Sequence, residues 1–105
     1  MEEANLNYIN ELSGGNLEFK NKLIGVLRAE LPEEIKTYEY FKSRADYPQM
    51  YQSVHKLKHK ISILGLEKSY YIAEKFESNL KNSSTELQSD FEEILTKMQQ
   101  FVALL

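Results

Sequence analysis

The sequence predicts an all-α protein. Its 105 residues include only four glycines and two prolines, too few for the many turns that a β domain requires. Apolar residues instead recur at spacings of three and four in one segment after another, which is the period of amphipathic helices. The length fits one domain over residues 1–105, and connections of a few residues make consecutive helices antiparallel neighbours. We therefore expect an up-and-down helical bundle.

The first two helices are indicated by apolar spacing and by a break between them. The segment Ser13-Gly14-Gly15 ends a short N-terminal helix, and Asn16 can cap the helix that follows. Gly25 lies inside this second helix, at a cost of about 1 kcal/mol relative to alanine. The apolar face of the first helix is Leu6, Ile9 and Leu12, and that of the second is Phe19, Leu23, Val26/Leu27 and Leu31.

A third helix is predicted to begin at Pro32, because proline suits the first helical position. Glu33 and Glu34 then fall in its first turn, where the helix dipole favours acids. The segment Asp46-Tyr47-Pro48 restarts the chain. The apolar face of this third helix is Ile35, Tyr38, Phe41 and Ala45.

The next helix has the most regular apolar pattern of the chain. Its apolar positions alternate steps of four and three, and Gly65 can end it in a left-handed conformation. These positions are Met50, Val54, Leu57, Ile61 and Leu64.

Two further helices complete the chain. Asn82-Ser83-Ser84 is a loop between them, and Thr85 with Gln88 forms a capping box for the last helix. Their apolar faces are Leu66, Tyr70, Ala73, Phe76 and Leu80, and then Leu87, Phe91, Ile94/Leu95, Met98 and Phe101/Val102.

Composition and charge exclude several classes of protein. The chain has no cysteine, so a disulfide scaffold, a thiolate metal site and a cysteine nucleophile are excluded, and a reducing compartment is expected. A net charge of -3 disfavours nucleic-acid binding. No apolar run approaches the roughly 20 residues that cross a bilayer, and the Met-Glu-Glu start lacks a basic region. We expect a soluble, cytoplasmic protein without membrane insertion.

Charge is unevenly distributed along the chain. No acid occurs between Asp46 and Glu67, a stretch that contains Lys56, Lys58 and Lys60 together with both histidines. Such a run is often only a solvated face. It would also attract an acidic pocket on a partner and raise the association rate.

His55 is predicted to lie on the outer face of its helix. At 100° per residue, His55 points roughly 140° away from the apolar face and His59 roughly 180° away. Lys58 lies near 80°, Tyr51 near 100° and Ser62 near 120° by the same arithmetic. His55 is therefore expected to be exposed and flanked by Tyr51, Lys58 and Ser62 one or two turns away.

An exposed imidazole beside a lysine suits phosphoryl transfer. A neutral imidazole is a nucleophile near pH 7, and Lys58 at i+3 can neutralise a phosphoryl group as it arrives. The chain has neither a P-loop nor a kinase-type glycine-rich loop, so nothing in it predicts ATP binding. The phosphoryl group must then come from another protein.

These residues resemble the histidine-containing phosphotransfer (HPt) domain of bacterial multistep phosphorelay two-component systems. The family pattern His-x-Leu-Lys-Gly is similar to His55-Lys56-Leu57-Lys58-His59, and Gly65 matches a glycine about ten residues after the histidine. The segment from Leu12 to Phe19 resembles the family's Gly-Gly-Asp-x-x-Phe run, and the spacing to Glu30-Leu31-Pro32-Glu33-Glu34 also fits. The resemblance covers about residues 5–105.

The resemblance implies an up-and-down antiparallel four-helix bundle with a short additional N-terminal helix. His55 would accept a phosphoryl group on Nε2 from a receiver-domain aspartyl phosphate and pass it to another receiver aspartate, and Lys58 would stabilise the phosphoryl oxygens. The protein would be a stoichiometric carrier rather than an enzyme, a monomer with no cofactor of its own. Magnesium would be held by the receiver. The implied partners are response-regulator receiver domains and a hybrid sensor histidine kinase.

One position departs from the family pattern. The family has a small residue four positions after the phosphoacceptor, where this chain has His59. Its bulk would alter how closely a receiver docks, or its ring would hydrogen-bond the phosphoryl group. Tyr51, Gln52 and Ser62 are further candidates for contacts with the phosphate or a receiver.

Three alternatives remain at this point. A non-catalytic helical protein-interaction module would carry the same helices with incidental surface histidines. His55 and His59 at i and i+4 could share one divalent metal ion, although two ligands rarely suffice, no carboxylate is expected nearby on that face and three lysines would repel a cation. A hydrolase is disfavoured because an exposed base on a convex helix lacks a pocket.

Overall fold

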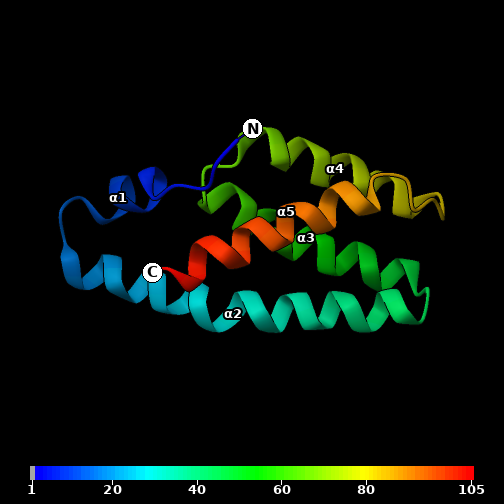
Figure 1. Cartoon of the computed structure of the whole chain (residues 1–105), viewed down its shortest axis with the longest axis horizontal. Coiled ribbons are helices and arrows are strands. Elements are labelled where there is room, and N and C mark those ends of the chain that lie inside the picture. Colours follow the sequence, from blue (N-terminus) through cyan, green and yellow to red (C-terminus); the bar gives the residue numbers. More distant parts are fainter. Residues whose placement is uncertain (1) are drawn as a thin grey trace.

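The computed structural model describes residues 2–105, which form five α-helices and no strand. The helices are α1 (Asn7–Ser13), α2 (Leu17–Ser43), α3 (Tyr47–Ile63), α4 (Glu67–Lys81) and α5 (Gln88–Ala103). α3 packs between α2 and α4, α5 contacts both α2 and α4, and α1 lies on the N-terminal part of α2 (Figure 1). The predicted all-α fold class is confirmed. Among residues 2–105, no helix combines the length and apolar character needed to span a bilayer.

α2 is one continuous helix, so the predicted break at Pro32 is wrong. Its 27 residues correspond to about 40 Å of helix, close to the 44 Å long axis of the molecule. Pro32 has no N–H to donate to the carbonyl of Arg28, which would favour a break. However, Leu27, Leu31 and Ile35 follow one another at steps of four across Pro32, and all three are buried. Packing of this face holds both halves of α2 in line, and residues 2–105 form five helices rather than the six indicated by the apolar pattern.

Two predicted helix ends also differ from the structure. Ala45 lies beyond the end of α2, exposed and with φ 51°, and so contributes nothing to the apolar face of that helix. The capping box of Thr85 and Gln88 is absent, because Leu87 is the residue that precedes α5 and no side chain caps it. Leu87 has φ 74°, and the N–H of Gln88 donates to the carbonyl of Thr85 within a turn. The left-handed Leu87 makes Thr85 part of this turn and prevents it from serving as the N-cap.

The predicted cap at Asn16 and the predicted glycine turns after two of the helices are confirmed. The side chain of Asn16 accepts a hydrogen bond of 3.0 Å from the N–H of Phe19 and so caps α2. Gly14 and Gly65 have φ values of 54° and 74°, the left-handed backbone conformation expected after α1 and α3. These two turns reverse the chain and set where α2 and α4 begin.

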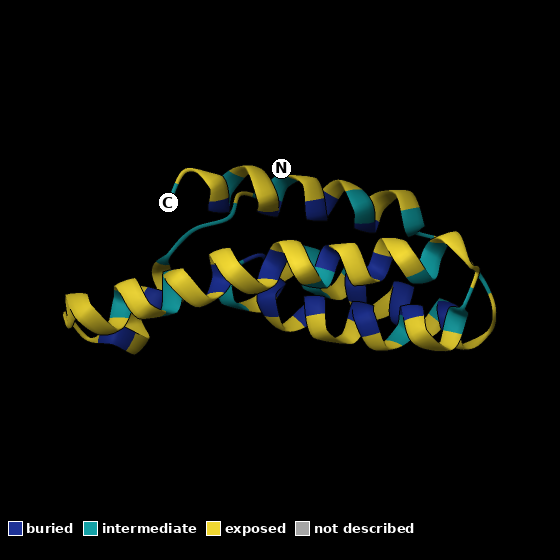
Figure 2. Ribbon diagram, turned by 90° about the horizontal axis from the view of Figure 1, so that it is seen from below, coloured by how far each residue is buried: buried dark blue, intermediate teal, exposed yellow. Residues whose placement is uncertain are grey.

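The core is formed by the sides of the helices that face one another (Figure 2). Tyr38, Phe76 and Phe91 are fully buried, with ring centroids 5.2–6.5 Å apart. The Tyr38 hydroxyl donates to Glu92 Oε2 over 2.9 Å, and burial together with this carboxylate raises the pKa of Tyr38 far above its usual value. The hydroxyl therefore remains a donor at all physiological pH values, and the polar end of Tyr38 has a hydrogen-bond partner inside the core.

Besides Ala45, three residues of the predicted apolar faces are exposed. Leu12, Phe19 and Val26 belong to α1 and to the N-terminal part of α2, at the end of the molecule that extends beyond the other long helices (Figure 1). α1 is the element that packs on this end of α2. One seven-residue helix covers too little surface to bury both apolar faces, so part of each remains exposed.

The N-terminal segment is attached to the turn between α3 and α4. The Glu2 carboxylate accepts hydrogen bonds of 2.8 and 2.9 Å from the N–H groups of Lys68 and Ser69 in the first turn of α4. The N–H of Asn5 donates to the carbonyl of Leu64. Burial opposes ionisation of Glu2, but the hydrogen bonds outweigh it and the pKa of this carboxyl is lowered. The segment thereby supplies the cap that α4 lacks in its own sequence.

Gly25 is a testable weak point of α2. It is exposed, and a Cβ at this position would meet nothing within 4 Å. We expect Gly25→Ala to raise the free energy of unfolding by about 0.5–1 kcal/mol, since alanine loses less backbone entropy in a helix. Gly65→Ala is the matched control with the opposite sign, because Gly65 has φ 74° and its Cβ would lie 2.6 Å from Asn5 Oδ1. Urea denaturation of both variants measures the difference. A Gly25→Ala variant no more stable than the parent would contradict this account of α2.

Candidate functional site

The site lies on α3. Burial of the apolar face of this helix determines which of its side chains are exposed to solvent. The five predicted apolar positions of this segment are all buried, with exposed fractions of 0–1%. Burying this stripe turns the opposite side of the helix to solvent. His55, the ninth of the 17 residues of α3, has 48% of its side chain exposed, as predicted. An imidazole is therefore presented at mid-helix, on an element held in place by a well-packed core.

Glu77 of α4 holds the His55 ring, a contact that sequence reasoning missed. Glu77 is buried, and its Oε2 lies 2.9 Å from Nδ1 of His55. An ionised carboxylate only accepts hydrogen bonds, so Nδ1 carries the proton and donates. In the neutral ring, Nε2 then bears the lone pair. The site thus has a half-exposed imidazole in one tautomer and one orientation.

Lys58 lies beneath the imidazole rather than beside it on the surface. Only 8% of its side chain is exposed, and its Nζ lies 3.2 Å from Glu77 Oε1 and 5.4 Å from the Tyr70 ring centroid. The predicted direction near 80° lies at the edge of α3 that α4 covers, which is why Lys58 is buried rather than free on the surface. Glu77 consequently joins Lys58 and His55 through its two carboxylate oxygens. The Lys58 ammonium offsets the charge of the Glu77 carboxylate, so this buried pair has almost no net charge.

Two aromatic side chains flank the imidazole along α3. The Tyr51 ring, one turn earlier, is near-parallel to the His55 ring at a centroid distance of 6.4 Å. Lys81 of α4 places its Nζ 4.9 Å from the Tyr51 ring centroid. The His59 ring, one turn later, lies edge-on at 5.1 Å and 89° to the His55 ring. Tyr51 and His59 therefore both lie beside His55, as the helical spacing predicts.

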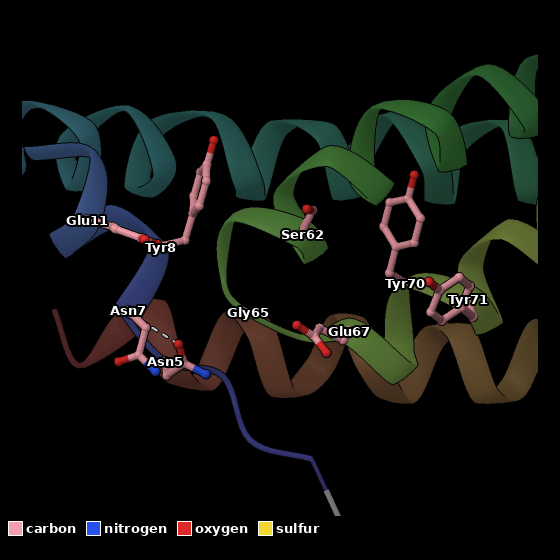
Figure 3. A pocket seen from close by; sticks show the side chains of 9 residues that line it. All are labelled: Asn5, Asn7, Tyr8, Glu11, Ser62, Gly65, Glu67, Tyr70 and Tyr71. Carbon is pink, nitrogen blue, oxygen red and sulfur yellow. Dashed lines mark hydrogen bonds between the residues drawn. The ribbon is translucent and has the colours of Figure 1, made fainter.

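The remaining two candidates belong to neighbouring surfaces. Gln52 is exposed and lines a shallow depression with Thr37 and Phe41 of α2. Ser62 is exposed two turns from His55 and lines a pocket of ≈ 610 Å³ between α1, α4 and the turn after α3. In Figure 3 its side chain lies between those of Tyr8 and Tyr70. The structure thus groups Tyr51, His55 and His59, and it places Gln52 and Ser62 at the periphery.

The acid-free segment between Asp46 and Glu67, with its three lysines, is only partly an exposed basic surface. Lys60 is buried against α2, where its Nζ lies 2.9 Å from both Glu30 Oε1 and Glu34 Oε2. Burial opposes the ammonium, but the two carboxylates outweigh it and raise the pKa of Lys60. Lys58 is paired with Glu77, and of the three lysines Lys56 alone is exposed. The absence of acids within the segment gave no indication that acids of α2 and α4 would neutralise two of its three lysines.

A metal centre finds no support in the described part of the chain. Within residues 2–105, no group of three or more histidines, cysteines or acids is arranged to hold an ion. A carboxylate does lie near His55, contrary to the expectation from the sequence, but Glu77 is already bound to Lys58. The His55–His59 pair supplies two ligands, whereas protein zinc sites use three or four.

Comparison with known proteins identifies no similar sequence or structure. No protein-family model, no curated protein and no solved structure matches the chain.

Proposed function

We propose that this protein is a phosphorelay intermediate that carries a phosphoryl group on His55. In this proposal the chain is a cytoplasmic HPt domain, and α2–α5 form an up-and-down antiparallel four-helix bundle with α1 as the additional short helix. The observation that carries the proposal is the half-exposed imidazole whose Nδ1 is bound by the buried Glu77 carboxylate. This contact leaves Nε2 as the nucleophile, on a convex surface that another protein domain can approach.

The transfer step needs no general acid or base from this chain. The Nε2 lone pair of His55 attacks the phosphorus of an aspartyl phosphate, the P–O bond to the aspartate breaks, and its electron pair leaves with the carboxylate. The proton stays on Nδ1, so the phosphorylated ring carries a positive charge. Glu77 is hydrogen-bonded to that proton and stabilises the charge as it forms.

Lys58 is proposed as the charge partner of the site. An isolated carboxylate behind the imidazole would repel the incoming phosphoryl dianion. The Lys58 ammonium, 3.2 Å from Glu77, cancels this repulsion at short range. Lys58 therefore favours phosphorylation by neutralising Glu77 rather than by reaching into solvent.

The proposal also defines the partners. The chain carries no nucleotide-binding motif, so it acts as a stoichiometric carrier and not as a kinase. It receives the phosphoryl group from the receiver domain of a hybrid sensor histidine kinase and donates it to a response-regulator receiver. These receivers supply the magnesium ion, and the carrier acts as a monomer.

A second candidate, a non-catalytic helical interaction module, is favoured by a different observation. Tyr8, Leu12 and Tyr71 are 45%, 50% and 64% exposed, on α1 and α4. Tyr8 and Tyr71 line the same pocket, and exposed apolar side chains that lie together often mark a protein-binding surface. This candidate requires no chemistry at His55.

The two candidates are separated by incubation with a phosphorylated receiver domain. The phosphorelay proposal predicts transfer of label to this chain as a phosphate that is labile in acid and stable in base, as a P–N bond requires. Phosphorus–nitrogen correlation in NMR spectra should place it on Nε2 of His55. Failure of phosphorylated receivers and of the small donor phosphoramidate to label the chain would favour the interaction module.

A further inference from the structure

The phosphoryl group attached to Nε2 of His55 needs hydrogen-bond donors, and two of the three lysines of α3 are already paired with carboxylates. Lys58 is committed to Glu77 and Lys60 to Glu30 and Glu34, and both lysines are buried. A phosphoryl group on the exposed side of the imidazole would therefore meet neither ammonium. Two basic donors remain on the outer face of α3, Lys56 and His59. Lys56 follows His55 directly, and side chains at i and i+1 of a helix do not face each other.

His59 occupies the appropriate position. It lies one helical turn from His55 on the same exposed face, where side chains at i and i+4 are neighbours. The two rings are 5.1 Å apart between centroids and nearly perpendicular, so the edge of one ring is directed at the other. The two nitrogen atoms of an imidazole lie on the rim of the ring, and at least one of them carries a proton in either charge state. Tyr51, on the other side of His55, is near-parallel at 6.4 Å and presents a ring face.

We propose that His59 binds the phosphoryl group on His55 through a ring N–H that donates to a non-bridging phosphoryl oxygen. This inference rests on the proposed function and assigns to His59 the direct contact that the burial of Lys58 removes. It stabilises the phosphorylated form of this chain relative to the unphosphorylated form. Receiver domains would then accept the phosphoryl group from His55 less readily than from an imidazole without this neighbour.

The equilibrium constant of transfer distinguishes this role from simple bulk. The reaction converts phospho-His55 and a free receiver aspartate into His55 and the aspartyl phosphate. Its equilibrium constant depends only on the free energies of these separated species. A bulky side chain that hinders docking changes the forward and reverse rates together and leaves this constant unchanged. A donor that binds the phosphoryl group in the free carrier changes it.

The experiment uses the full chain and one receiver domain charged with acetyl phosphate and then freed of the donor. His59→Leu keeps the bulk and removes the donor, whereas His59→Gln keeps an N–H donor. We expect His59→Leu to shift the equilibrium toward the receiver by about three- to tenfold, the effect of losing one net hydrogen bond, and His59→Gln to shift it less. Circular dichroism and thermal unfolding verify the fold, which an exposed substitution should change little.

The outcomes separate this inference from the function on which it rests. An equilibrium constant for His59→Leu equal to that of the parent, with both proteins labelled at His55, overturns the role of His59 and leaves the phosphorelay function intact. A change in transfer rates alone likewise assigns His59 a steric role only. Absence of acid-labile phosphate on the parent chain overturns the proposed function and the role of His59 together.

Discussion

Replacing His55 with glutamine is expected to abolish phosphorylation of this protein. Glutamine matches the polarity of histidine but has no nucleophilic ring nitrogen, so no P–N bond can form. Label transfer from a phosphorylated receiver, followed on gels without acid treatment, should fall to background. Because His55 is half exposed, the substitution should change the free energy of unfolding by less than about 0.5 kcal/mol beyond the loss of its contact with Glu77.

His59→Gln provides the matched control for this experiment. It makes the same change of side chain one turn away on the same exposed face. The control should still be labelled, since His55 and Glu77 are intact. Labelling of His55→Gln at the level of the control would show that the phosphoryl group is attached elsewhere, and the proposed function would then lose its acceptor.

Removing the Glu77 carboxylate is expected to impair both stability and phosphorylation. Glu77→Ala leaves Lys58 as a buried ammonium without its carboxylate, a change that costs about 3–5 kcal/mol when one partner of a buried ion pair is deleted. It also releases Nδ1 of His55, so the ring samples both tautomers and several orientations. Metal-binding histidines that lose the partner orienting the second ring nitrogen lose about ten- to a hundredfold in affinity or activity, and we expect a similar fall in the rate of phosphorylation. Urea denaturation and the initial rate of labelling by phosphoramidate measure the two effects.

A double variant separates the two roles of Glu77. Glu77→Leu combined with Lys58→Met replaces the buried pair by apolar side chains of similar size, which is often neutral or stabilising. Stability should return to within about 1 kcal/mol of the parent. Phosphorylation should remain slow, because Nδ1 of His55 still has no acceptor. Recovery of the parental labelling rate in this double variant would show that Glu77 serves only to satisfy Lys58.

The sequence alone predicts those features that depend on a single helix and its ends. The stripe of Met50, Val54, Leu57, Ile61 and Leu64 identified the buried face of α3, and the exposed position of His55 followed from it by helical geometry. The Asn16 cap and the left-handed Gly65 were equally readable, because caps and turns are formed by residues close together in the chain.

Features that depend on contacts between helices were not readable in this way. The continuation of α2 through Pro32 is decided by packing on the other helices, which outweighs the local preference of proline. A trace of it was present in the sequence, since the steps of four from Leu27 to Leu31 and on to Ile35 continue the same stripe across Pro32. The charge state of the α3 surface was misjudged for the same reason, because the acids that neutralise Lys58 and Lys60 belong to α4 and α2.

The amino-acid sequence by itself determined that this is a helical protein and that His55 is exposed in the middle of its most regular helix. Only the tertiary structure decided that the ring of His55 is oriented by Glu77 and that Lys58 is buried against the same carboxylate. The physical reason is the range of the interactions. Helical periodicity and capping act within a few residues, whereas Glu77 reaches His55 across 22 positions of the chain through the packing of α4 on α3.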